Sequence, residues 1–266
     1  LTFSSVDLTV QGLAGARVTT IDGNQAGPTI TFKGSITRKF LLKGFTIING
    51  VNQGRGGGIN IQGSAPTIRE CVIRNNRCTT YGAGIGGTYG SFILEDCTVE
   101  DNLAGGSGSA GYASGGGVGM SGSTKSSPVI RRCLFRRNTC NTRGGGIYFS
   151  YNQNCLIEQC VITENTTLGT TGNLDGGAGI FAALNAVLVI RSNLIYNNTS
   201  NSNGGGIKYF NVTGLPVVNN TIVNNKGGSI AGFANRGSYG TNVSAAVENC
   251  ILWNNGTQEL AFTLAD

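Results

Sequence analysis

Cys133-Leu134-Phe135-Arg136-Arg137-Asn138 and, a few residues later, Gly144-Gly145-Gly146-Ile147 are one copy of a two-part phrase that recurs along most of the chain. The first part reads small-x-apolar-x-x-Asn, and the second is a glycine cluster followed by an aliphatic residue. Successive copies lie roughly 26 to 36 residues apart. A repeat of this length is typical of a solenoid, in which each unit buries its apolar face only by stacking on its neighbours.

Apolar residues alternate within each copy, as in a strand with one buried face. In one copy we expect Ile68, Cys71 and Ile73 to point inward, and in the next copy Ile93 to do the same. Each glycine phrase supplies a second strand, and its glycines permit positive φ at a tight corner. The repeat therefore predicts an all-β fold, a parallel β-helix of about eight to nine coils with loops protruding at one corner.

The repeat runs through both halves of the 266 residues, which favours one domain over residues 1–266. Clear repeats span about residues 40–256, residues 1–39 are expected to form the first coils, and residues 257–266 a terminal strand. The chain begins at Leu1 without Met, as expected of a processed product whose signal peptide has been removed. Strand-like composition at both ends predicts open strand edges and a tendency to stack end to end.

Two sets of small polar residues recur once per copy. We expect both to stack as buried structural ladders along the axis, because stacked side chains of one kind can hydrogen-bond to the copies above and below. The asparagine ladder is Asn76, Asn102, Asn138, Asn165, Asn198, Asn225 and Asn255. The cysteine ladder is Cys71, Cys97, Cys133, Cys160 and Cys250, with Asn193 and Asn220 at the intervening positions.

The pairing of Gly-Gly-Ala/Gly-Ile with Phe/Ile-x-x-Asn resembles the repeat of the chlamydial polymorphic outer membrane proteins. Phe135 to Asn138 matches the second motif fully. The chain also resembles the wider class of right-handed parallel β-helix surface proteins, over about residues 40–256. The resemblance implies a right-handed β-helix and a secreted, adhesive passenger.

Charges alternate in sign from coil to coil at fixed positions around the anchors, as at Arg69, Glu95 and Arg131. Opposite charges in register predict ion-pair ladders that oppose register slips. The competing interpretation is an active site, since β-helices of the pectate-lyase and polygalacturonase type use clustered acids. Its best candidates are Glu95, Asp96, Glu100, Asp101, Arg131 and Arg132.

Several further features bear on partners. The net charge is +6 and no His is present, yet the alternating signs do not form the basic stripe of a nucleic-acid site. The short apolar runs predict no membrane span, and no cofactor or metal site is expected. Three sequons are the better candidates for glycosylation: Asn197, Asn211 and Asn242.

Outward positions become apolar toward the C-terminal half. They predict either a contact stripe or a surface that the segment 232–245 covers. The stripe comprises Val161, Leu194, Tyr196, Val223, Ile251 and Trp253. Three aromatic residues lie near the glycine phrases, and we expect them either to stack on sugars or to pack within the protein: Tyr148, Phe181 and Tyr209.

The sequence thus favours a non-catalytic extracellular or cell-surface protein, structural or adhesive, whose partners are further copies of itself or surface glycans. The alternative is a polysaccharide lyase or glycoside hydrolase.

Overall fold

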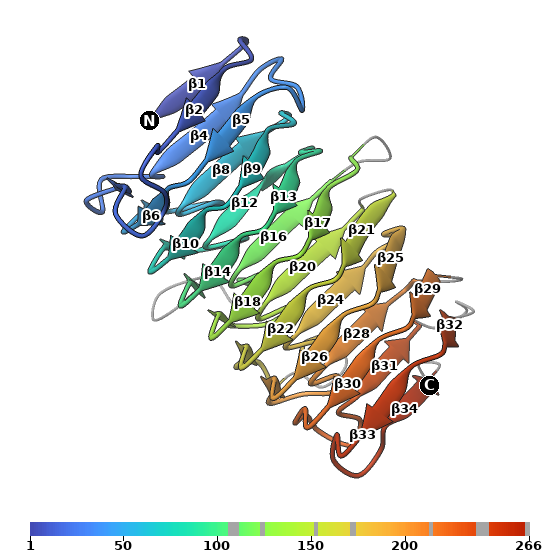
Figure 1. Ribbon diagram of the computed structural model, residues 1–266. Helices are drawn as coiled ribbons and strands as arrows, with labels where there is room; N and C mark the ends of the chain where they lie inside the picture. The colour runs from blue at the N-terminus through green and yellow to red at the C-terminus, as the bar shows by residue number, and fades with distance from the viewer. Residues whose placement is uncertain are drawn as a thin grey trace.

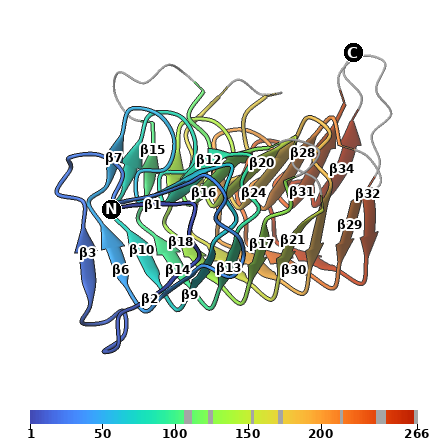
Figure 2. The ribbon, with the colours of Figure 1, turned by 90° about the horizontal axis from the view of Figure 1, so that it is seen from above.

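The computed structural model describes residues 1–105, 112–122, 126–151, 154–170, 174–212, 215–237 and 245–263. These residues form short strands that follow one another in a regular stack from the N-terminal to the C-terminal end (Figures 1 and 2). Neighbouring strands pair in parallel throughout the described ranges, in which no helix occurs. Each coil contributes one strand to each of up to four sheets, which we name sheets A to D.

Sheet A is built from the strands that follow the glycine phrases. Its ten strands, in spatial order, are β1 (Thr2–Ser4), β4 (Ile30–Lys33), β8 (Ile59–Gln62), β12 (Ile85–Thr88), β16 (Val118–Ser121), β20 (Ile147–Ser150), β24 (Ile180–Ala183), β28 (Ile207–Phe210), β31 (Phe233–Arg236) and β34 (Leu260–Thr263).

Sheet B lies before the cysteine-ladder positions. Its nine strands are β2 (Thr9–Gln11), β5 (Leu41–Lys43), β9 (Thr67–Arg69), β13 (Ile93–Glu95), β17 (Val129–Arg131), β21 (Cys155–Glu158), β25 (Leu188–Arg191), β29 (Leu215–Val218) and β32 (Ala245–Glu248).

Sheet C lies between the two ladders. Its nine strands are β3 (Thr20–Asp22), β6 (Thr46–Ile48), β10 (Val72–Arg74), β14 (Thr98–Glu100), β18 (Leu134–Arg136), β22 (Val161–Thr163), β26 (Leu194–Tyr196), β30 (Thr221–Val223) and β33 (Ile251–Trp253). The nine strands in sheets B and C confirm the predicted number of coils.

Sheet D is a six-stranded sheet that the sequence analysis missed. Its strands are β7 (Val51–Asn52), β11 (Arg77–Cys78), β15 (Leu103–Ala104), β19 (Thr139–Cys140), β23 (Thr166–Thr167) and β27 (Thr199–Ser200). Strands of two residues leave no periodicity to detect. Residues 103–104 and 166–167, which directly follow the ladder residues Asn102 and Asn165, belong to β15 and β23.

The interior is filled by one or two aliphatic or aromatic side chains from each strand of sheets A to C. Ile68 and Ile73 are fully buried, with Val72 between them half-buried and outward. The expectation for Ile93 was wrong: Leu94 is buried in its place. Leu94 pairs with Ile68 in the parallel register, so Ile93 falls on the outer face of β13.

Two corners of each coil are made by residues other than glycine in the left-handed conformation. They precede the two ladder positions, as Asp96 (φ +54°) precedes Cys97 and Asp101 (φ +54°) precedes Asn102. We expected positive φ at the corner glycines, and Gly144 (φ +67°) does turn the chain into sheet A. At the other two corners, polar and charged residues take up a conformation that is costly for most L-residues.

The asparagine ladder satisfies the backbone at the corner between sheets C and D. The Oδ1 of Asn102 accepts the backbone N–H of Asn76 at 3.1 Å and its Nδ2–H at 3.0 Å. The Nδ2 of Asn102 then donates to Oδ1 of Asn138 at 3.0 Å, and the pattern repeats up to Asn255. All seven side chains are buried, so each amide group finds in its neighbour the partner that water would otherwise supply.

A glycine that faces this ladder stands immediately before each of the seven sheet A strands from β8 to β31. A Cβ atom on Gly84 would lie 2.6 Å from the carbonyl oxygen of Gly117 and 3.1 Å from Nδ2 of Asn102. The same position has no room for a side chain in coil after coil, as at Gly117 and Gly146. The two halves of the repeated phrase are thus coupled in space: the Asn ladder requires the glycine that faces it.

We predict that Asn138→Ala lowers the free energy of unfolding by about 2–4 kcal/mol, because Asn102 would be left with a buried N–H and amide donor unpaired. Urea unfolding followed by circular dichroism measures the change. Asn201→Ala is the control: this exposed amide makes one hydrogen bond, to Leu168 O, and its loss should cost less than about 1 kcal/mol. Equal losses in the two variants would contradict the role of the ladder.

Candidate functional site: the charged corner rows

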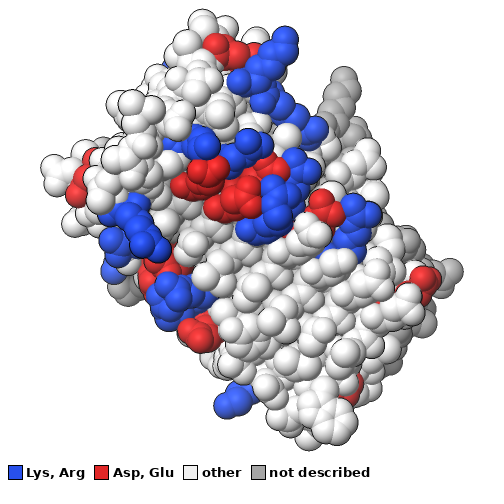
Figure 3. Space-filling model, in the orientation of Figure 1, with Lys and Arg blue, Asp and Glu red and all other residues white. Residues whose placement is uncertain are grey.

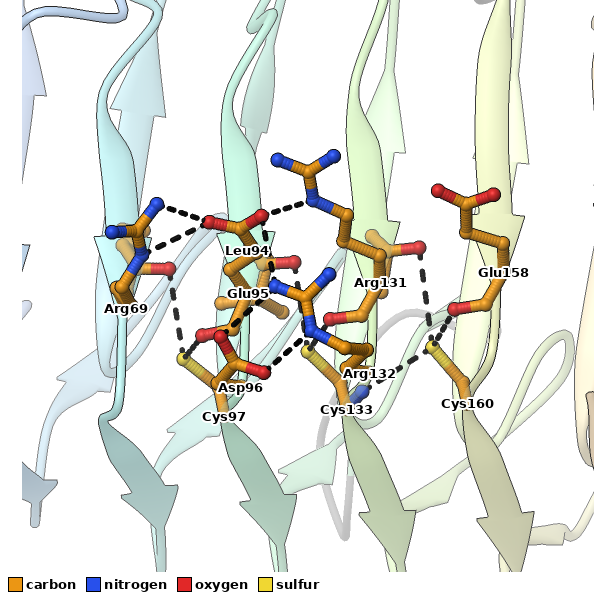
Figure 4. Close-up of polar contacts among 12 residues, drawn as sticks. Arg69, Leu94, Glu95, Asp96, Cys97, Arg131, Arg132, Cys133, Glu158 and Cys160 are labelled. Carbon is orange, nitrogen blue, oxygen red and sulfur yellow. Dashed lines mark hydrogen bonds and ion pairs between the residues drawn. The ribbon is translucent and has the colours of Figure 1, made fainter.

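The predicted charge cluster lies on the outer side of the corner between sheets B and C, where the coils of β9, β13 and β17 stack. Glu95, at the end of β13, is nearly fully buried, with 2% of its side chain exposed. Arg69 Nε donates to its Oε2 at 2.9 Å, Arg132 Nη2 to its Oε1 at 3.1 Å, and Arg131 Nε also to Oε1 (Figure 4). One carboxylate is therefore held by three guanidinium groups from the coils on either side.

Asp96 occupies the left-handed corner residue next to Glu95. Arg132, at the same corner one coil later, forms a bidentate pair with it: Nε donates to Oδ1 at 2.8 Å and Nη2 to Oδ2 at 3.0 Å. The two left-handed corners thus aim an aspartate and an arginine at each other in fork geometry, the strong form of this contact.

The same arrangement repeats at the corner between sheets C and D. Arg137 donates to both oxygens of Asp101 at 2.8 Å. Arg136 Nε donates to Glu100 at 2.6 Å, and Arg137 Nη2 reaches the same oxygen at 3.3 Å. Glu-Asp on one coil therefore faces Arg-Arg on the next at both corners. Figure 3 shows these charges gathered over the earlier coils, with the later coils largely uncharged on that face.

The electrostatics of the cluster favour ionised acids. Burial acts to raise the pKa of Glu95, but hydrogen bonds from Arg69, Arg132 and Arg131 outweigh it, so this pKa lies below its ordinary value. The pKa of Asp96 is lowered chiefly by its hydrogen bond from Arg132. A general acid needs the opposite shift. Among the described residues no group of three or more acids, cysteines or histidines is placed to hold a metal ion.

All six residues of the catalytic alternative are therefore engaged in ion pairs, at two separate corners. Glu95, Asp96, Arg131 and Arg132 meet at the first corner, and Glu100 and Asp101 pair with other arginines at the second. What this arrangement can do chemically is lock the register of two coils. It leaves no carboxylate among the four poised to accept or donate a proton.

The cysteine positions form a second hydrogen-bonded ladder at the corner between sheets B and C. The backbone N–H of Cys71 donates to Sγ of Cys97 at 3.4 Å, and that of Cys133 to Sγ of Cys160 at 3.5 Å. Asparagine takes part in the same row. The backbone N–H of Cys160 donates to Oδ1 of Asn193 at 2.9 Å, and the backbone N–H of Asn220 donates to Sγ of Cys250 at 3.4 Å. Sulfur and amide oxygen thus serve as alternative acceptors for one buried N–H.

All eight cysteines are free thiols. Seven of them are buried, and Cys250 is half-buried. Burial raises the pKa of Cys78 and of Cys140, which lie off the ladder, to about 12, so both remain protonated at neutral pH. A protonated buried thiol is a poor nucleophile, which makes these residues part of the packing.

The apolar stripe follows two adjacent outward rows of sheet C. Val161, Leu194 and Ile251 lie in one row with Thr221, and Tyr196, Val223 and Trp253 lie in the next. Exposure rises toward the last coil, from 38% at Leu194 to 61% at Ile251 and 72% at Trp253. Residues 238–244, within the segment that we considered as a cover, lie outside the described residues.

The remaining predicted residues fall into different environments. Asn197 is exposed at a left-handed corner and Asn211 is half-buried, whereas Asn242 lies outside the described residues. Tyr148, Phe181 and Tyr209 are buried, which contradicts a role in stacking on sugars.

Lys208, which the sequence analysis overlooked, is buried on the outer side of sheet A and donates to Asp175 O. Burial lowers its pKa to about 7.

Comparison with known families agrees with the stacked coils. The family described as right handed beta helix region matches residues 107–258, more than half of the chain. The chain therefore belongs to this family, and its solenoid is a right-handed parallel β-helix. The match does not extend to the finer resemblance, the chlamydial repeat. No curated protein and no solved structure matches the chain. No helix among the described residues is long and apolar enough to cross a membrane.

We predict that Glu95→Gln destabilises the protein by about 1–3 kcal/mol at pH 7, because three arginines lose their shared charged acceptor. Asp96→Asn, at a carboxylate 38% exposed, should cost less than about 1 kcal/mol.

The lowered pKa of Glu95 adds stability above about pH 4 that is lost as the pH falls through the folded-state value. Urea titrations should show wild type and Glu95→Gln converging below that pH; a constant difference would contradict the linkage.

At the cysteine ladder we predict that the acceptor matters more than the side-chain volume. Cys160→Asn should lie within about 1 kcal/mol of wild type, because its Oδ1 replaces Sγ as the acceptor for Cys133 N, as Asn193 Oδ1 does for Cys160. Cys160→Val fills similar space without an acceptor and should cost about 1–3 kcal/mol. Thermal and urea unfolding compare the two; greater stability of the valine variant would refute the assignment.

Proposed function

We propose that this β-helix is a non-catalytic extracellular or cell-surface protein with a structural or adhesive role. One observation carries the proposal: the four clustered acids that could have formed an active site are each paired with arginines of the next coil. Their pairing accounts for the charge alternation and leaves none of these four acids unpaired. The extended, regular stack supplies a rigid scaffold along which surfaces can be displayed.

The adhesive part of the proposal draws on two features. The repeat resembles that of secreted adhesin passengers, and the outward rows of sheet C end in exposed Ile251 and Trp253. Exposed aromatic and aliphatic side chains that adjoin one another are typical of contact surfaces. The partners that we propose are surface glycans, a host surface or further copies of the chain.

The alternative, a polysaccharide lyase or glycoside hydrolase, is tested directly by incubating the protein with acidic and neutral polysaccharides, with and without Ca²⁺. We expect no cleavage and no rise in melting temperature with Ca²⁺, because no described acid cluster is placed to hold the ion. Cleavage that is lost in Asp96→Ala, a variant that remains folded by circular dichroism, would establish the alternative and overturn the proposal.

Self-association is the second testable part. In this chain the first and last strands of sheets A, B and C each have a neighbour on one side only, and unpaired strand edges invite pairing with another chain. We expect an average mass that rises with concentration in light scattering, and axial stacks in electron microscopy. A constant monomer mass at high concentration would rule out end-to-end stacking while leaving the adhesive role untouched.

A further inference from the structure

A hollow of about 550 Å³ lies on the outer side of sheet A near its N-terminal end, apart from the charged corner rows. Its walls come from the turn before β8, from the outer face of β8 and from the end of β12. The polar residues that line it are Asn52, Arg55, Asn60, Gln62, Thr80 and Thr88. Arg55 is the one formally charged residue among the lining residues, and the others carry amides or hydroxyls.

The hollow begins where the aromatic packing of sheet A ends. The outward row that contains Asn60 begins at Thr2 and Thr31, continues from Asn60 through Gly86 and Gly119, and is then filled by buried Tyr148 and Phe181. Tyr81, from the turn before β12, stacks on Tyr148 with ring centroids 5.5 Å apart. Toward the N-terminal end from Tyr81, the described part of the chain places no aromatic side chain in this row, and polar Asn60 lines the hollow instead.

Arg55 is held at the rim by a well-ordered turn. Asn52 Nδ2 donates to the carbonyl oxygen of Arg55, and Gly54 N donates to Asn52 Oδ1 at 3.1 Å. The guanidinium lies over the Tyr81 ring, 5.2 Å from its centroid, and pairs with no described carboxylate. This differs from the arginines of the corner rows, each of which faces an acid one coil away.

Thr80 supplies an independent indication. Its Oγ1 is buried and has no hydrogen-bond partner, in a wall of the same hollow. A buried hydroxyl without a partner costs free energy, and a ligand in the hollow would complete the missing hydrogen bond once the Thr80 side chain turns its hydroxyl out of this closed position. The hollow therefore combines a guanidinium fork that pairs with no described acid, the side-chain amides of Asn60 and Gln62, and an unsatisfied hydroxyl.

We propose that this hollow binds an anionic group, a carboxylate or a sulfate, with Arg55 as its charged partner and Thr80, Asn60 and Gln62 as hydrogen-bonding neighbours. The guanidinium fork matches two oxygens of such a group, and the lining holds no acid to repel it. The site stands apart from the scaffold role proposed above, and it would serve either a free anion or an acidic residue of a glycan.

The test titrates the full chain with acetate, sulfate, a glucuronate disaccharide and the neutral glucose disaccharide, by calorimetry and NMR at constant ionic strength. We expect saturable binding of the anions and none of the neutral sugar. Tighter binding of the glucuronate disaccharide than of acetate would identify a glycan-borne group as the source, and equal binding a free anion. Arg55→Gln should weaken binding about 10- to 100-fold. Arg17→Gln, which removes the same charge from an exposed loop, should leave it unchanged.

Thr80→Val separates recognition from folding. Because the hydroxyl has no partner within the protein, its removal should leave the urea midpoint unchanged or higher, while anion affinity falls several-fold. The proposal is overturned if no anion binds saturably, if the neutral disaccharide binds as well as glucuronate, or if Arg17→Gln weakens binding as much as Arg55→Gln. An affinity unaffected by Thr80→Val would likewise contradict it.

Discussion

The structure depends on one kind of hydrogen bond made at two corners of the coil: a side-chain acceptor on one coil takes the backbone N–H of the same position on the coil before. Corners interrupt the sheets, so these N–H groups have no strand partner, and burying them unpaired would be costly in every coil. Asn102 performs this role for Asn76, and Cys97 performs it for Cys71. The asparagine ladder in turn requires the glycines that face it, since these positions have no room for a side chain.

The repeated phrase was enough to predict the parallel β-helix and the number of coils, because a stack of like units leaves a period in the sequence. The phrase could not reveal strands too short to contain an alternation of apolar and polar residues. Two-residue strands such as β11 have no alternation of their own, so sheet D was missed. The reversal of Ile93 and Leu94 arose because two apolar residues stand side by side there; the spacing to the anchor is the same as in the previous coil, since Leu94 lies three residues before Cys97 as Ile68 does before Cys71.

The candidate site shows a similar division. The alternation of charge signs pointed to contacts between coils, and the structure places Glu95 between arginines on both sides. The conformation that makes this possible was not visible in the sequence: Asp96 and Arg132 both occupy left-handed corners, which bring their side chains face to face. Nor could spacing alone reveal the hollow near Arg55, which depends on where the ring of Tyr81 lies across the row.

The hydrogen bonds between the ladder asparagines have a direction, since each Nδ2 donates one of its two N–H groups to Oδ1 of the next asparagine toward the C-terminal end. The two ends of the ladder are therefore chemically unlike. At the first, Gly50 N–H donates to Oδ1 of Asn76, and at the last the carboxylate of Glu259 accepts the backbone N–H and one Nδ2–H of Asn255. Only the terminal partners are special, and each internal coil receives the same bonds that it passes on. A coil duplicated or deleted between them would leave both ends satisfied, so the length of such a protein can change in evolution one coil at a time.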